Sequence, residues 1–281
     1  MSTSYAVLGT YPPTQCGLAT FSAALVRALR SADDVIDVVA LVDERSASFP
    51  SEVTHQWVRS QRGGAAGAAA RLNRSDVVII QHEYGIFGGR DGMDVLEVVR
   101  AVTVPVIVVF HTVLSAPTAN QRRILVELAS ECDIVVTMTW TARERLISKY
   151  GVDPETVVVI PHGAETTHVA DEIAVERPAG ARPVVLTWGL LGAGKGIEWG
   201  IAAMSSLRDL DPAPLYRIVG ETHPKVVERE GEKYRRMLVD ETDRLGVEDL
   251  EDAVGAGGGA LDVREDADHR FAAGVEARDV R

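Results

Sequence analysis

Apolar runs rich in Val and Ile alternate along the first part of the chain with segments whose apolar positions recur at helical spacing. The runs predict strands at 4–9, 35–42, 76–81, 105–110, 132–137 and 156–161, and the segments between them predict helices at 18–31, 64–72, 92–102, 118–130 and 140–149. Strands that are apolar throughout are typical of a parallel sheet covered on both faces. Because the alternation is strict, we expect right-handed crossovers and a doubly wound α/β sheet.

The alternation stops after Pro161 and starts again near residue 183. Residues 166–182 mix charges, Pro and Gly without a sustained period, which predicts a linker. The second series predicts, in order, strand 183–188, helix 196–207, strand 215–219 and helix 224–245. We therefore expect two Rossmann-like domains, the first at 1–165 and a second, incomplete one at 183–247.

The last part of the chain, 248–281, is built mainly from Ala, Gly, Asp, Glu and Arg and has few large apolar side chains. Such a segment can bury little surface, so we expect an atypical, disordered tail. A Rossmann-like sheet of only two predicted strands also leaves an open edge. We therefore hypothesise that the gene is truncated or frameshifted within the second domain.

The stretch TWGLLGAGKGIEWGI, residues 187–201, follows an apolar strand and leads into a helix. Its glycines would let the backbone approach an anion, the start of the helix supplies free N–H groups, and Lys195 adds a positive charge. The P-loop pattern is met as far as Gly194 and Lys195 but fails at Gly196, where Ser or Thr would hold Mg²⁺. This disfavours an NTPase and favours another diphosphate site, with a tight turn and a solvated lysine as the purely structural alternative.

Three histidines directly follow predicted strands: His82 in QHEYGIFGG, His111 in VFHT and His162 in IPHGAE. In an open α/β sheet, ligands bind beyond the carboxyl ends of the strands. A histidine there can hydrogen-bond sugar hydroxyls or assist proton transfer. One such histidine is more often structural than catalytic, but three at equivalent positions indicate that at least one faces a ligand.

Composition narrows the set of partners. A net charge of −12 and a pI of about 5.1 disfavour nucleic acid as a partner. No apolar stretch reaches the length of a membrane span, so only peripheral membrane contact is compatible with the sequence. The start of the chain has no signal-peptide pattern, and Cys16 and Cys132 have no metal-type spacing. We expect a cytoplasmic protein with no metal site and no tightly bound cofactor.

Taken in order, YPPTQCGLATFSAALVRAL, QHEYGIFGG, VVFHT, VIPHGAE and LTWGLLGAGKGIEWGIAAM resemble retaining glycosyltransferases of the GT-B fold, family 4, over residues 5–247. The resemblance implies an N-terminal domain that mostly binds the acceptor and a C-terminal domain that binds a nucleotide sugar. It implies transfer of a hexosyl unit, mannosyl or glucosyl, to a glycan, lipid or small-molecule acceptor, with retention at the anomeric carbon. The nucleoside-diphosphate sugar would be a co-substrate.

The resemblance also implies roles for the motif residues. His111 would approach the reacting sugar as the catalytic residue. The donor diphosphate would lie against Gly17, Gly194, Lys195 and Gly196, and the acceptor side or interdomain cleft would be lined by His82, Glu83, Tyr84, His162 and Gly163. Lys195 and the helix N-termini are suited to stabilise negative charge on the departing diphosphate.

The sequence departs from the family pattern at two points. Many relatives carry an arginine shortly after the glycine that ends the first strand of the second domain, whereas this chain has Leu190. The E-x7-E region that grips the donor is absent. Two alternatives therefore stay open: a non-catalytic remnant that binds sugar or nucleotide, and a P-loop-like NTPase, which Gly196 disfavours.

Overall fold

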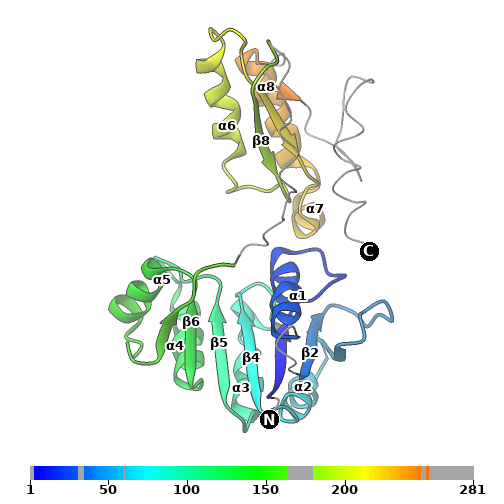
Figure 1. Cartoon of the computed structure of the whole chain (residues 1–281), viewed down its shortest axis with the longest axis vertical. Coiled ribbons are helices and arrows are strands. Elements are labelled where there is room, and N and C mark those ends of the chain that lie inside the picture. The colour runs from blue at the N-terminus through cyan, green and yellow to red at the C-terminus, as the bar shows by residue number, and fades with distance from the viewer. Residues whose placement is uncertain (1–2, 31–34, 60, 164–179, 248–250, 253–281) are drawn as a thin grey trace. The chain divides into compact units, whose positions relative to one another are not determined.

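The computed structural model describes residues 3–30, 35–59, 61–163, 180–247 and 251–252 (Figure 1). The chain divides into two compact units, Met1–Thr167 and His168–Arg281. Each unit has its own sheet and its own hydrophobic core. Most of the predicted linker, 166–182, and of the predicted tail, 248–281, lies outside the described residues.

The first unit is built on a seven-stranded sheet in the order β3-β2-β1-β4-β5-β6-β7, with every neighbouring pair parallel. The strands are β1 (Ser4–Gly9), β2 (Val35–Val42), β3 (Val53–Val58), β4 (Val77–His82), β5 (Val106–Phe110), β6 (Ile134–Thr137) and β7 (Val157–Val159). Strand β1 pairs with both β2 and β4, so the strand order reverses at this point. This reversal is where open α/β sheets bind their ligands.

Helices cover both faces of this sheet (Figure 1). Their bounds are α1 (Gly17–Arg30), α2 (Gly64–Leu72), α3 (Val95–Ala101), α4 (Ala119–Ser130) and α5 (Trp140–Arg145), with a 3₁₀ turn at Arg90–Gly92 and a π-helical turn at Leu146–Tyr150. Helix α1 packs on the face that carries Val7 and Ile79. Helices α2, α3 and α4 pack on the face that carries Leu8 and Ile80.

The six strands and five helices predicted for this unit are all present, and the α/β prediction is confirmed. The prediction missed β3, because Thr54, His55 and Gln56 interrupt its apolar pattern. Strand β3 lies at the edge of the sheet, where full burial is not required, so a mixed sequence is tolerated there.

The second unit contains a three-stranded parallel sheet in the order β10-β9-β8. Its elements are β8 (Val184–Trp188), α6 (Ile197–Met204) with a 3₁₀ turn at Ser205–Leu207, β9 (Leu215–Val219), α7 (Pro224–Glu230), α8 (Lys233–Leu245) and β10 (Glu251–Asp252). Ile201 of α6, Ile218 of β9 and Leu238 of α8 form the centre of its core. Helices α6 and α8 therefore pack together on one face of this sheet.

Two predictions for the second unit need correction. The single helix predicted at 224–245 is two helices, α7 and α8, separated at Gly231, which has a φ of +58°. The sheet has a third strand, β10, which pairs with β9 through Glu251 and Tyr216. A strand of two residues carries no periodic pattern that a sequence could reveal.

Strand β8 lies at an edge of the second sheet and exposes apolar side chains. Val184, Leu186 and Trp188 share one face and are 45%, 46% and 76% exposed. On the opposite face, the Thr187 hydroxyl is hydrogen-bonded to the Tyr216 hydroxyl at 2.9 Å, toward the core. The face that carries Trp188 has no helix packed over it among the described residues.

The second unit depends on a close backbone approach between the loops that follow β8 and β9. Gly220 has a φ of +155°, and a Cβ atom on it would lie 1.8 Å from the carbonyl oxygen of Gly189. We expect Gly220→Ala to destabilise the unit by about 3 kcal/mol, because one of the two loops must move. Hydrogen exchange of peptides from 215–247 should accelerate, while exchange in the first unit should not change.

Gly192→Ala is the matched control. A Cβ at Gly192 would make only an ordinary contact, 3.6 Å from a methyl of Val226. Exchange in 215–247 that is equally slow in Gly220→Ala and in the control would contradict the proposed importance of this approach.

Candidate functional site

The carboxyl ends of β1, β4 and β5 meet at one edge of the first sheet, beside the start of α1. The loop after β1 leads directly into α1 at Gly17, and it is tied together by Thr10 Oγ1 and Cys16 Sγ, 3.2 Å apart. The N–H of Ala19 donates to Cys16 Sγ at 3.4 Å. A polar loop, a helix N-terminus and two strand ends therefore lie together at the point where the strand order reverses.

His111 stands at the centre of this edge. Its Nε2 is 2.7 Å from Gln81 Oε1, and its backbone N–H donates to the carbonyl of His82 at 3.1 Å. Phe21 of α1 makes edge contacts with two imidazoles, with ring centroids 4.9 Å from His111 and 5.1 Å from His162. The structure thus brings together two of the three predicted histidines, from the ends of β5 and β7.

The electrostatics of His111 favour an uncharged ring. Burial, and in second place the nearby His162, lower its pKa from the usual 6.5 to about 4. At neutral pH the ring is therefore a hydrogen-bonding group and not a cation. Such a group suits the hydroxyls of a sugar better than it suits a phosphate.

His82 lies on the other side of the sheet. It is the last residue of β4, and its side chain is fully buried among Tyr84, Phe87 and Phe110. Neither ring nitrogen has a hydrogen-bond partner, and burial lowers the pKa to about 3. The ring has no exposed surface with which to touch an acceptor, and His82 reaches the site only through its carbonyl oxygen.

Glu83 and Tyr84 connect loops of the first unit. One carboxylate oxygen of Glu83 accepts from the backbone N–H of Tyr84 at 2.9 Å, and the other accepts from the Thr112 hydroxyl. Tyr84 is 9% exposed, and its hydroxyl donates to the carbonyl of Gln121 at 3.4 Å. These contacts join the loop after β4 to the loop after β5 and to α4, and so they hold His111 in place.

His162 and Gly163 are exposed at the end of the described part of the first unit. The Nδ1 of His162 is 2.7 Å from the carbonyl oxygen of Gly163, which orients the ring toward Phe21. Gly17 opens α1, and a Cβ at that position would meet nothing within 4 Å. The space beside the N-terminus of α1 is therefore open.

The glycine-rich stretch of the second unit forms the turn between β8 and α6. Gly194 and Gly196 have φ values of +88° and +72°, and Gly196 is the N-cap of α6 with no side chain capping the helix. Lys195 is exposed, and its ammonium has no hydrogen-bond or ion-pair partner within 180–247. A cation beside uncapped helical N–H groups is suited to bind an anion.

The neighbouring loop of the second unit is firmly anchored. Leu191 and Thr222 form an isolated bridge, in which Leu191 N donates to Glu221 O at 2.7 Å and His223 N donates to Leu191 O at 2.9 Å. Arg235 of α8 donates to the carbonyl of Gly220 at 3.2 Å and to Glu232 at 3.1 Å. These bonds hold Leu191, which lies at the start of the turn that carries Lys195, in a fixed position.

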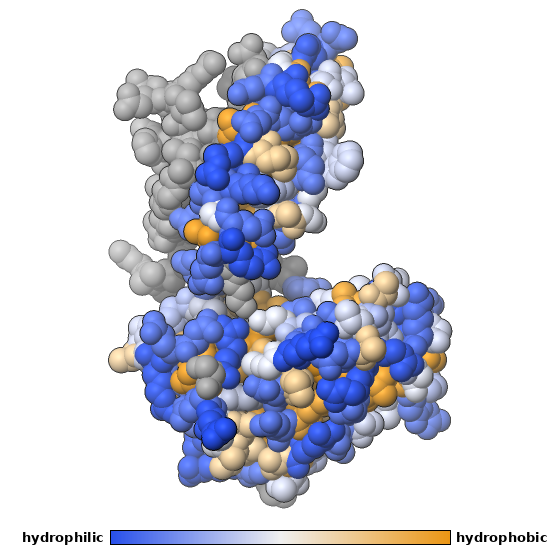
Figure 2. Space-filling view, turned by 180° about the vertical axis from the view of Figure 1, so that it is seen from behind, coloured by the Kyte–Doolittle hydropathy of each residue, from blue (hydrophilic) through white to orange (hydrophobic). Residues whose placement is uncertain are grey.

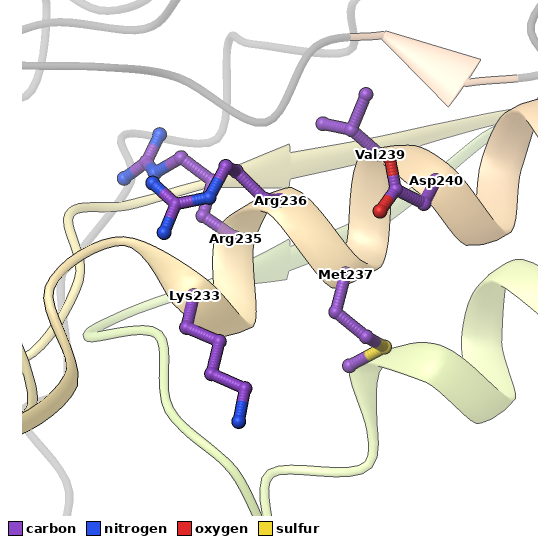
Figure 3. Close-up of a pocket in the computed structure, with 6 residues that line it drawn as sticks. All are labelled: Lys233, Arg235, Arg236, Met237, Val239 and Asp240. Carbon is purple, nitrogen blue, oxygen red and sulfur yellow. The ribbon is translucent and has the colours of Figure 1, made fainter.

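Surface depressions lie away from these residues. One of about 430 Å³ is lined by α8 residues that include Lys233, Arg236 and Met237, and Figure 3 shows their side chains leaving the helix in different directions. Another of about 240 Å³ lies between the end of β3 and the start of α2, beside Trp57 and Arg59. Neither contains a predicted site residue.

Metal-binding and membrane-spanning features are absent from the described ranges. No group of three or more His, Cys, Asp and Glu side chains there could hold a metal ion. No helix in those ranges is long and apolar enough to cross a membrane. On the side shown in Figure 2, hydrophobic residues of both units are interspersed with hydrophilic ones.

The profile of Glycosyltransferase Family 4 matches residues 16–168, more than half of the chain. The chain belongs to this family. The match includes the start of α1, the ends of β4 and β5 and the His162 loop, which are the segments that form the edge described above. The predicted family membership is confirmed. A comparison with curated proteins finds no match.

Solved glycosyltransferases share the fold of this family 4 chain. A glycosyltransferase from Rickettsia africae is 13% identical, with a TM-score of 0.62, over 92% of this chain and 69% of that one. HepE of Anabaena, in complex with UDP and glucose, is 15% identical, with a TM-score of 0.63, over 91% and 70%. An α,α-trehalose-phosphate synthase (UDP-forming) from Burkholderia vietnamiensis is 14% identical, with a TM-score of 0.56, over 87% and 70%. The architecture of this chain is of the GT-B type.

Two residues of the site, Phe21 and Gln81, were not predicted from the sequence. Phe21 follows Gly17 by one helical turn, which places an aromatic ring near the helix start. Gln81 is fully buried and lies in the run VVIIQH. A polar residue inside an otherwise apolar strand was the available signal, because a buried amide requires a hydrogen-bond partner.

His82→Leu tests the assignment of His82 to the core. We expect the free energy of unfolding at neutral pH to be unchanged or to rise by about 1 kcal/mol, because the substitution removes an unpaired buried N–H. In the native protein, stability should fall as the pH drops from 6.5 toward 3, since unfolded His82 gains a proton in this range and folded His82 does not. Urea denaturation at pH 7.5 and pH 5.0 should show a smaller fall in the variant.

The control is His55→Leu, at a partly exposed histidine on β3. It should retain most of the native pH dependence. Strong destabilisation by His82→Leu at pH 7.5 would show that the ring has a polar partner in solution.

Proposed function

We propose that this family 4 chain serves the transfer of a hexosyl unit, glucosyl or mannosyl, from a nucleoside-diphosphate sugar to a hydroxyl acceptor with retention of configuration. The observation that carries the proposal is His111, an uncharged imidazole anchored at the reversal point of the sheet beside an open helix start. An uncharged ring in that place favours hydrogen bonding to sugar hydroxyls. The proposed compartment is the cytoplasm, where the free Cys16 and Cys132 would stay reduced.

The two units are proposed to bind different parts of the substrates. In the first unit, His111 and His162 would meet the sugar and the acceptor, a glycan, lipid or small molecule. In the second unit, the N–H groups at the start of α6 and the Lys195 ammonium would bind the diphosphate. HepE and the trehalose-phosphate synthase are described with UDP, so UDP-glucose is the first donor to test and GDP-mannose the second.

The proposed chemistry relies on stabilising the leaving group. As the bond between the anomeric carbon and the diphosphate breaks, negative charge grows on the diphosphate, and Lys195 with the α6 N-terminus would offset it. Glu83 is not proposed as a nucleophile, since both of its oxygens already accept hydrogen bonds from within the protein. His111 is not proposed as an acid, because its pKa of about 4 leaves it unprotonated at neutral pH.

Turnover of UDP-glucose tests the function. We expect release of UDP that depends on an added acceptor mixture, with the α-anomer of the new glycoside identified by NMR. His111→Ala should lower this turnover by about a hundredfold, in line with the loss of one transition-state hydrogen bond in a preorganised site. Saturable binding of UDP-glucose or GDP-mannose without any product would instead support a non-catalytic binding protein.

Lys195→Ala tests the diphosphate site separately from turnover. Removing the ammonium should weaken UDP binding about tenfold, since one partly exposed charge contact is worth about 1.4 kcal/mol in a binding constant. Isothermal titration with UDP measures the change. Lys233→Ala, at another exposed lysine of the same unit, is the control and should bind UDP as the native chain does. Equal affinities for all three proteins would refute the assignment of Lys195.

A further inference from the structure

Gln81 occupies a position where a polar side chain is costly. It is fully buried near the end of β4 and is paired with Val109 of β5. Successive residues of a strand point to opposite faces, so Gln81 lies on the α1 side while its neighbour His82 lies in the opposite core. Burial of an amide without a hydrogen bond costs free energy, so the presence of glutamine at this buried position needs an explanation.

The reason is the contact with His111. Gln81 Oε1 lies 2.7 Å from His111 Nε2, a good hydrogen-bond distance. Gly9 leaves room for the Gln81 side chain, because a Cβ on Gly9 would be only 3.0 Å from Gln81 Cβ. Strand β1 thus ends in a residue with no side chain at the point where β4 needs room for its amide.

We propose that Gln81 is a positioning residue that holds the proton of the His111 imidazole on Nε2 and leaves the lone pair of Nδ1 to accept a hydrogen bond from a sugar hydroxyl. An amide oxygen can only accept, so the ring nitrogen that faces it must carry the hydrogen. The His111 N–H bond to the carbonyl of His82 fixes the backbone, Phe21 contacts the ring from α1, and the Gln81 amide determines which ring nitrogen carries the hydrogen. This inference rests on the proposed function and adds the direction of the hydrogen bond to the substrate.

The opposite amide orientation makes the opposite prediction. With the Gln81 NH₂ group toward the ring, His111 Nε2 would accept and Nδ1 would carry the hydrogen, so the site would donate to the sugar. In the present orientation, Gln81 Nε2 and Ser22 Oγ are both buried without a hydrogen-bond partner beside Gly9. The two orientations differ in a measurable property, the tautomer of a single histidine.

Nitrogen NMR of the full chain with ¹⁵N-labelled histidine measures that tautomer without any substrate. The signals of His111 are assigned by their loss in His111→Gln. At pH 7 we expect Nε2 to be protonated and Nδ1 to be unprotonated in the native chain. In Gln81→Leu we expect a mixture of the two tautomers, and in Gln81→Glu both nitrogens protonated, because a buried carboxylate stabilises the imidazolium.

Gln56→Leu is the matched control, since Gln56 lies in the same sheet on β3 and hydrogen-bonds Ser46. It should leave the His111 signals unchanged. A native chain with the proton on Nδ1, or a Gln81→Leu variant that keeps the native tautomer, would overturn the proposal. If Gln81→Leu does not fold, the native spectrum and the nearly isosteric Gln81→Glu still decide the question.

Kinetics link the tautomer to the substrate. Equal populations of two tautomers halve the competent fraction, so Gln81→Leu should raise the KM for the sugar only about twofold. Gln81→Glu should raise the KM more, because Nδ1 of His111 is then protonated and can no longer accept a hydrogen bond from the sugar. Absence of turnover in the native chain would contradict the proposed function and leave the NMR result standing. Turnover by a native chain in which Nδ1 of His111 carries the proton would contradict the role of Gln81 and leave the proposed function standing.

Discussion

Parallel pairing of β1 with both β2 and β4 is the constraint on which the first unit depends. Because of this pairing, α1, which follows β1, covers one face of the sheet. Helices α2, α3 and α4, which connect the later strands, cover the other face. The loops after β1 and β4 therefore separate, and the start of α1 is left open at the carboxyl edge. Gly9 completes this arrangement, because a side chain at the end of β1 would crowd the side chain of Gln81, which contacts His111.

Much of this fold could be predicted from the sequence, because burial on both faces forces the strands to be apolar throughout. The run VVIIQH and the run VIVVF give strands with no knowledge of their neighbours. The edge strand β3 and the short β10 escaped prediction for the same physical reason. Each lies at an edge of its sheet, where pairing with one neighbour, β2 or β9, defines the strand and no continuous apolar run marks it.

The site was harder to predict than the fold, since the face on which a side chain lies depends on a shift of one residue. His82 and His111 have the same relation to strand ends in the sequence, yet one ring is in the core and the other lies beside α1. The odd-numbered residues of β4 and β5, such as Ile79 and Val109, face α1, and His111 continues this alternation one residue beyond β5. The strand order and the position of α1 determine which face is open at this edge, and a local sequence motif does not encode either of them.

In the second unit, the exposed edge of β8 affects how the isolated unit behaves in solution. Strand β8, of sequence VVLTW, has one edge that pairs with no other strand among the described residues and one face, that of Trp188, without a packed helix, and these features favour its addition to another copy of itself. Preparations of the second unit alone would be expected to precipitate as their concentration rises. Leu186→Lys, which places a charge on the exposed face of the strand, or a mild detergent that covers its apolar side chains, would then be needed to keep the isolated unit in solution.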